Sequence, residues 1–98
     1  MITSKQRAYL RSLASGLKPI FQIGKGGINE NMIGQLSDAL NVREMIKIHV
    51  LNNSEYSAKE ALLDLSQQLN AEQVCAIGNN LVLYRQAEKE EHRKIELP

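Results

Sequence analysis

The sequence predicts a small α/β (α+β) domain in the order αβαβαββ, with a four-stranded mixed sheet. Three observations lead to this prediction. Apolar residues recur at helical spacing in three segments and in short strand-like runs in four others. Glycines, prolines and asparagines separate these segments. The chain has 98 residues, 43% of them apolar, which is enough for one core without a metal or a disulfide.

The first helix is expected to begin after Thr3, because Thr3 and Gln6 form a capping-box pattern. Apolar residues then recur at helical spacing as far as Leu17, and Pro19 ends the helix. A short strand, residues 20–23, follows directly, since a proline is tolerated at the start of a strand.

The middle of the chain repeats this alternation of helix and strand. Asn29 is expected to cap a helix whose apolar stripe runs to Leu40. Residues 45–51 alternate between apolar and polar side chains, which predicts a strand with one buried face. Ser57 and Glu60 repeat the capping-box pattern and begin a third helix. A strand, a helix and a second strand favour a parallel pair joined by a right-handed crossover.

The end of the domain is expected to be a β-hairpin. Residues 74–77 and 81–85 are strand-like, and Gly-Asn-Asn joins them. The last strand should therefore be antiparallel to its neighbour. We divide the chain into a folded domain over residues 1–85 and a charged tail over residues 86–98. Little apolar content and mixed charge are typical of a frayed helix or a disordered tail.

Charge is unevenly distributed along the chain, although its net value is only +1. Residues 1–29 contain five basic residues and no acidic one, whereas the rest of the chain has seven basic and eleven acidic residues. Arg7 and Arg11 lie one helical turn apart, and Lys18 follows on the same side. A positive potential confined to one end of the domain favours a polyanionic partner there.

A glycine-rich loop, Gly24-Lys25-Gly26-Gly27, connects the first strand to the second helix. It lacks the spacing of a nucleotide triphosphatase P-loop and the third glycine of a dinucleotide fingerprint. A Gly-x-x-Gly loop before a helix lets a sugar-phosphate chain approach the backbone closely, as in KH modules. Taken alone, the pattern more often marks a tight connection with positive φ angles. It is the basic residues of the same segment that favour nucleic acid.

Two further basic residues lie in the later strands. Lys47 shares a polar strand face with His49 and could extend a basic surface. Tyr84 and Arg85 end the last strand, where they could stack on a base and pair with a phosphate, or form a half-buried pair at the sheet edge.

We find no catalytic or metal-binding pattern in the sequence. His49 has no second ligand at metal-binding spacing, and Cys75 lies in a strand-like run where a buried apolar role is favoured over that of a nucleophile. We therefore expect no enzyme activity, no metal and no cofactor. A single cysteine, no signal peptide and no apolar run of about 20 residues favour a cytoplasmic protein without membrane association.

Three segments resemble the CRM domain, the chloroplast RNA splicing and ribosome maturation domain. They are LRSLASGLKPIFQIGKGG (residues 10–27), IKIHVL (46–51) and IGNNLVLYR (77–85). The resemblance covers about residues 3–85 and is strongest to the small stand-alone bacterial YhbY-like proteins. It implies a fold similar to the C-terminal domain of translation initiation factor three, no enzymatic activity, and association with precursors of the large ribosomal subunit.

The resemblance also implies which residues bind RNA. It assigns this role to the loop Gly24, Lys25, Gly26 and Gly27 and to the basic residues around it, Arg11, Lys18, Lys47 and Arg85. Arg7 joins them through the charge pattern of the first helix. Two positions depart from the family pattern: Ser15 stands where members often carry histidine, and Asn79 where an arginine is common.

We expect a monomer that binds RNA, most specifically ribosomal RNA in large-subunit precursors, and no small-molecule substrate. One alternative is a protein-interaction factor that docks on the ribosome through an open sheet face or the charged tail. Another is a binder of small phosphate ligands, which the missing third glycine and the missing magnesium site disfavour.

Overall fold

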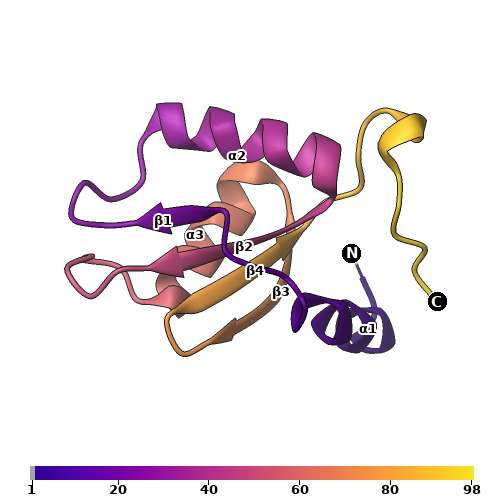
Figure 1. Ribbon diagram of the computed structural model, residues 1–98, viewed down its shortest axis with the longest axis horizontal. Helices are drawn as coiled ribbons and strands as arrows, with labels where there is room; N and C mark the ends of the chain where they lie inside the picture. Colours follow the sequence, from indigo (N-terminus) through magenta and orange to yellow (C-terminus); the bar gives the residue numbers. More distant parts are fainter. Residues whose placement is uncertain (1) are drawn as a thin grey trace.

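The computed structural model describes residues 2–98 and contains a four-stranded sheet with helices on both faces (Figure 1). The elements are α1 (Ser4–Ala14), β1 (Phe21–Ile23), α2 (Glu30–Arg43), β2 (Met45–Val50), α3 (Ala58–Leu69), β3 (Glu72–Ile77), β4 (Asn80–Tyr84) and the short 3-10 helix η1 (Glu90–His92). The predicted fold class and element order are confirmed. None of the helices in residues 2–98 has the length and apolar run needed to span a bilayer.

The three helices begin at the capping residues that the sequence predicts. The Thr3 hydroxyl accepts the N–H of Gln6, and the Gln6 side chain accepts the N–H of Thr3. Ser57 and Glu60 form the same reciprocal pair, and the Asn29 side chain accepts an N–H from the first turn of α2. Each cap satisfies backbone donors that have no partner within the helix.

The helix α1 ends earlier than the apolar stripe predicts. Its last residue is Ala14, and Ser15 forms the C-cap. Gly16 follows and has a low helix propensity, and the chain then leaves the helix through Leu17 toward β1. The shortened helix leaves one end of the sheet face beneath it uncovered.

The strands lie in the order β1-β2-β4-β3. The strand β1 is parallel to β2, as predicted for strands joined by a crossover helix. The strand β4 is antiparallel to both β2 and β3, so it lies in the interior of the sheet, and residues 81–84 are all buried. A bulge between Gln73 and Cys75 adds Val74 to β3, and β3 begins at Glu72, earlier than predicted.

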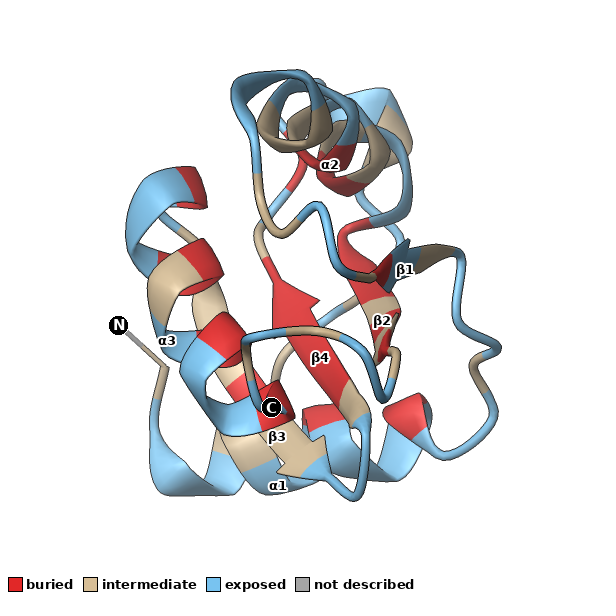
Figure 2. Ribbon diagram, turned by 90° about the vertical axis from the view of Figure 1, so that its left-hand side faces the viewer, coloured by how far each residue is buried: buried red, intermediate tan, exposed pale blue. Residues whose placement is uncertain are grey.

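Apolar side chains form one cluster on each face of the sheet. The buried residues of the strands and helices are red in Figure 2. The larger cluster lies under α2 and α3 and includes Leu36, Leu65 and Leu81. The smaller one lies under α1 and includes Leu10 and Val82. The β1–α2 loop, the β2–α3 loop and the β3–β4 hairpin all lie at one end of the sheet, at the left of Figure 1.

The buried residue Glu44 holds the C-terminal segment against the domain. It caps α2 with a φ of +64°, and its side chain is fully buried. Its carboxylate accepts the N–H of Ala87 at 2.9 Å, of Lys94 at 2.6 Å and of Ile95 at 3.0 Å. Burial alone would raise the pKa of this carboxyl, but these three N–H groups and the nearby charge of Arg93 outweigh it and lower the pKa.

Residues 86–98 differ from the frayed helix or disordered tail that the sequence favours. Ala87 is buried, Ile95 and Leu97 pack against the cluster under α1, and the only helical element is η1. The few apolar residues of the segment all face the domain, and Glu44 supplies the acceptors for its backbone. Composition alone does not reveal an acceptor that is more than 40 residues away in the sequence.

Candidate nucleic-acid interface

The loop Gly24–Gly27 is a tight turn at the end of β1. The N–H of Gly27 donates to the carbonyl of Gly24 at 3.0 Å, and Gly27 has a φ of +70°. A Cβ at Gly24 would lie 3.3 Å from Leu51 Cδ1 and 3.6 Å from Asn53 Oδ1. These two glycines therefore have a structural role, because one adopts a left-handed conformation and the other packs closely on the β2–α3 loop. Lys25 and Gly26, at the tip, are exposed.

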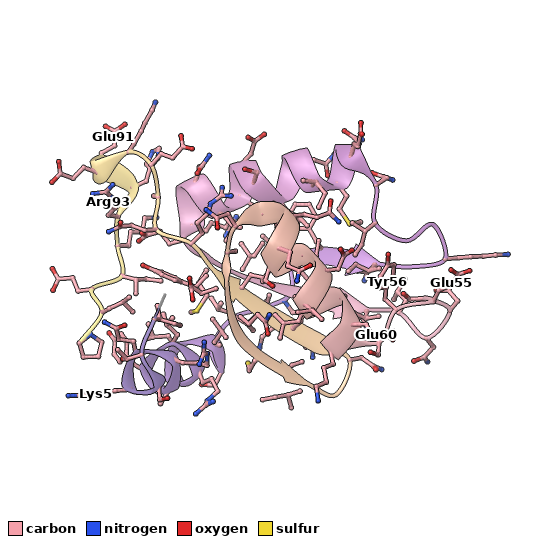
Figure 3. All side chains as sticks on the ribbon, turned by 180° about the vertical axis from the view of Figure 1, so that it is seen from behind. Lys5, Glu55, Tyr56, Glu60, Glu91 and Arg93 are labelled. Carbon is pink, nitrogen blue, oxygen red and sulfur yellow. The ribbon has the colours of Figure 1, made fainter. Side chains whose placement is uncertain are left out.

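The β2–α3 loop lies against this turn and brings one aromatic ring and one acid to it. A Cβ at Gly27 would be 3.8 Å from the ring of Tyr56. Glu55 is exposed at the same end of the molecule (Figure 3). The carboxylate of Glu30 lies in the first turn of α2 and offsets the positive end of the helix dipole. The positive charge that the loop presents to an anion is therefore that of Lys25.

Four cations surround two small hollows on the sheet face that α1 leaves open. The first hollow, of about 170 Å³, is lined by Arg11 and Lys47, and the second, also about 170 Å³, by Lys18, Arg43 and Lys47. No carboxylate lines either hollow. We call these four side chains, Arg11, Lys18, Arg43 and Lys47, the basic face. The structure thus brings together three of the basic residues that the sequence singles out.

A row of polar side chains leads from the basic face toward the glycine loop. Gln22, His49 and Asn80 are aligned across β1, β2 and β4, one pleat beyond Lys47. The His49 Nδ1–H donates to Asn80 Oδ1 at 3.0 Å, which orders the middle of the row. Lys47 and the first residue of the loop, Gly24, are four residues apart in register, or about 13 Å along the strands.

Cys75 lines the first hollow together with Arg11 and Lys47 and is not the buried residue that the sequence predicts. It is half-buried and lines the hollow, because the β3 bulge turns it to this face and α1 ends before covering it. Burial raises the pKa of the Cys75 thiol, while the charges of Arg11 and Lys47 partly offset the rise. The pKa of the thiol therefore depends on the two cations that line the first hollow.

The structure places two of the predicted site residues apart from this face. Arg85 follows β4 at the opposite end of the sheet from the loop, and its guanidinium donates to the carbonyl of Leu69 in α3 and to Ser37 and Asn41 in α2. Arg7 donates from Nε to the carbonyl of Gln73 at 2.9 Å. Both side chains are half-buried and bind protein groups, so they are not part of the basic face.

Sequence reasoning missed Arg43 as a member of the basic face. It lies in the last turn of α2, where a cation interacts favourably with the helix dipole. A basic residue at this position is common in helices and does not by itself indicate a binding site. Its position two residues before β2, the strand that carries Lys47, was the available signal. Within residues 2–98 no group of three histidine, cysteine, aspartate or glutamate side chains is arranged to hold a metal ion.

The fold and this surface are those of a small α/β domain with an open basic sheet face beside a glycine-rich loop. The chain belongs to the CRS1/YhbY (CRM) domain family, whose model matches residues 2–85.

Proteins that are similar to this chain in sequence or in structure support its assignment to the CRM domain family. The chain is 47% identical over 98 residues to a Bacillus subtilis protein named as a probable RNA-binding protein, YqeI, and all of both chains is covered. It is 33% identical over 97 residues to a Haemophilus influenzae RNA-binding protein, with 99% of this chain and 95% of the relative covered. The solution structure of a Staphylococcus aureus protein described as a candidate RNA-binding protein has 48% identity and a TM-score of 0.73, again over all of both chains.

Proposed function

We propose that this chain is a non-catalytic RNA-binding protein that binds ribosomal RNA in precursors of the large ribosomal subunit. One observation carries the proposal: the basic face and the GKGG loop are linked on one open side of the sheet, and no carboxylate lines the hollows between the cations. Relatives of similar length named as RNA-binding proteins support RNA as the polyanion. The assignment to large-subunit precursors depends on the CRM resemblance.

The two parts of the surface have different tasks in this proposal. Arg11, Lys18, Arg43 and Lys47 attract and position the phosphate chain, since such contacts fix orientation without reading sequence. The loop lets the backbone of the RNA approach closely at Gly26, where an added Cβ would meet open space, and Lys25 pairs with a phosphate. The strip of about 13 Å between the two parts fits a few nucleotides of a single strand or a splayed loop.

The test is binding of the purified full chain to fragments of large-subunit ribosomal RNA across a salt series. Phosphate contacts make log affinity fall linearly with log salt, by about 0.7 per neutralised phosphate for single strands. We expect a steep slope that corresponds to roughly four phosphates, one for each of the exposed cations Arg11, Lys18, Lys25 and Arg43. Absence of binding to every fragment, or a salt-independent affinity, would contradict the proposal.

A second candidate function is docking on a ribosomal or assembly protein. It is favoured by one observation, the 71% exposure of Ile77 beside the first hollow. An apolar interface depends far less on salt than phosphate contacts do. Binding to a ribosomal particle that stays constant over the salt series, with no binding to naked RNA, would favour this candidate instead.

A further inference from the structure

The first hollow of the basic face has an apolar floor and lies where α1 ends too early to cover the sheet. Its floor contains Ala14 from α1 and Val82 from β4, both of them buried. Its volume of about 170 Å³ is well below the roughly 300–1,000 Å³ of pockets for drug-sized ligands. The hollow therefore has room for one small flat ring system and not for a larger molecule.

The rim of the hollow carries both charge and neutral hydrogen-bonding groups. Arg11 and Lys47 both line it. Asn80 uses its Oδ1 to accept from His49, which leaves the NH₂ of its amide to donate. The Ser15 hydroxyl donates to the carbonyl of Ser12 and keeps its lone pairs for a donor. An apolar floor, a guanidinium, an ammonium and both kinds of hydrogen-bonding group thus surround one small space.

We propose that this hollow holds one unpaired nucleobase of the bound RNA, stacked beneath Arg11, with its phosphate paired to Lys47. The inference rests on the proposed function and adds a base-binding site to the phosphate contacts described above. Splayed-out bases stack on guanidinium planes and on apolar side chains, and their edges bind amides and hydroxyls. Two other ligands fit the hollow less well. A phosphate alone would make no contact with the apolar floor, and an apolar peptide would leave Arg11 and Lys47 without an anionic partner. The site predicts a preference for single strands and loops over duplexes.

Cys75 gives a direct test, because it is the single cysteine of the chain and lines this hollow. The rate of its alkylation by N-ethylmaleimide is measured at one fixed pH of about 8, because only the thiolate reacts. The ligand is a pool of random single-stranded RNA of roughly 12 nucleotides, and its saturation is followed by fluorescence anisotropy. With RNA at about ten times its Kd, the reaction should slow about tenfold, because one molecule in eleven stays free.

The control ligand is an abasic strand with the same number of phosphates, at a concentration that gives equal occupancy. It should slow alkylation much less than the RNA does, because it can pair with the cations that favour ionisation of the thiol but has no base to fill the hollow. Equal protection by the abasic strand, or no protection while the RNA is saturating, would overturn the inference. In the second case the proposed function would stand, since RNA would be bound elsewhere on the surface.

Two tryptophan variants test the same site without using the thiol. Ser15→Trp should fill the hollow from its rim, whereas Ser12→Trp adds the same ring to an exposed position one turn earlier. The first should weaken binding of the single-stranded pool at least about fivefold relative to the second, as expected for loss of one stacked base. Equal binding by the two folded variants would overturn the inference. If the wild type itself fails to bind any RNA, the proposed function fails first.

Discussion

Arg85 in the segment after β4 donates to both oxygens of Ser37 in α2. Its Nη2 lies 2.9 Å from the Ser37 carbonyl oxygen and 2.9 Å from the Ser37 hydroxyl. Its Nη1 donates to the carbonyl of Leu69, at the end of α3, at 2.8 Å. One guanidinium therefore ties α2 to α3, and the residue that ends the IGNNLVLYR segment serves the fold.

Replacing this residue by Arg85→Met should lower stability without changing RNA binding. The substitution removes all the guanidinium donors and leaves their half-buried acceptors unpaired, which should cost about 1–3 kcal/mol of unfolding free energy. Urea denaturation measures the loss. The affinity of the folded variant for RNA should remain that of the wild type, and a large fall in affinity at constant stability would show that Arg85 contacts RNA.

Within the glycine loop, the substitution Gly27→Ala should destabilise the protein and Gly26→Ala should not. Gly27 has a φ of +70°, a conformation that costs an L-residue about 1–2 kcal/mol, whereas an added Cβ at Gly26 meets nothing within 4 Å. Thermal unfolding of the two variants compares the same chemical change at neighbouring positions. Equal melting temperatures would mean that the turn at Gly27 relaxes freely.

Removing the negative charge of Glu55 should strengthen RNA binding. Glu55 lies in the loop that packs on the glycine turn, and Glu91 lies at the far end of the molecule (Figure 3). Glu55→Gln should raise affinity at low salt, and the gain should fade as the salt concentration increases. Glu91→Gln is the matched control and should have little effect. A similar gain from both variants would indicate that only net charge matters.

The docking of the C-terminal segment should depend on pH through Glu44. The hydrogen bonds to this carboxylate lower its pKa in the folded protein, so their contribution is fully present above the pKa of the unfolded chain, about 4.3 for a glutamate. It is lost as the pH falls below that value through the lowered pKa of the folded state. The hydrogen-exchange protection factors of the amides of Ala87, Lys94 and Ile95, which correct for the pH dependence of intrinsic exchange, should therefore fall in acid.

The variant Glu44→Gln provides the control for this pH dependence. Its amide nitrogen cannot accept the N–H of Ala87, so the variant should be less stable than the wild type at pH 7 by about 1–3 kcal/mol. The difference between the two proteins should shrink in acid. A constant difference from neutral to acidic pH would show that the charge of Glu44 does not hold the segment.

Local signals explain why so much of the fold could be predicted from the sequence. The caps at Thr3, Asn29 and Ser57 lie within three residues of their partners, and the alternation of residues 45–51 identifies a strand by itself. The order of the strands and the anchoring of residues 86–98 by Glu44 depend on contacts between distant segments. No short pattern encodes those contacts.

The candidate site could be predicted only in part, because some of its residues have a local signal in the sequence and others are identified only by contacts between distant segments. Lys25, Arg11 and Lys18 stand out because the first 29 residues have no acid. Arg43 has only a weak signal in the sequence, its position shortly before the strand of Lys47, and the fold shows that both side chains line one hollow. Likewise Cys75 was expected in the core, because neither the bulge in β3 nor the early end of α1 is visible in the apolar pattern.

The most direct test of the RNA surface compares the double variant Arg11→Ala, Lys25→Ala with the charge-matched double variant Lys89→Ala, Lys94→Ala. All four side chains are exposed, but Lys89 and Lys94 line neither hollow and belong to the C-terminal segment, which lies at the opposite end of the molecule from the glycine loop (Figure 1). Binding to large-subunit ribosomal RNA fragments is measured across a salt series. We predict that the first variant lowers the slope of log affinity against log salt by about 1.4, that is 0.7 for each lost phosphate contact, while the second leaves it unchanged. Equal slopes for both variants would contradict the placement of RNA on this surface.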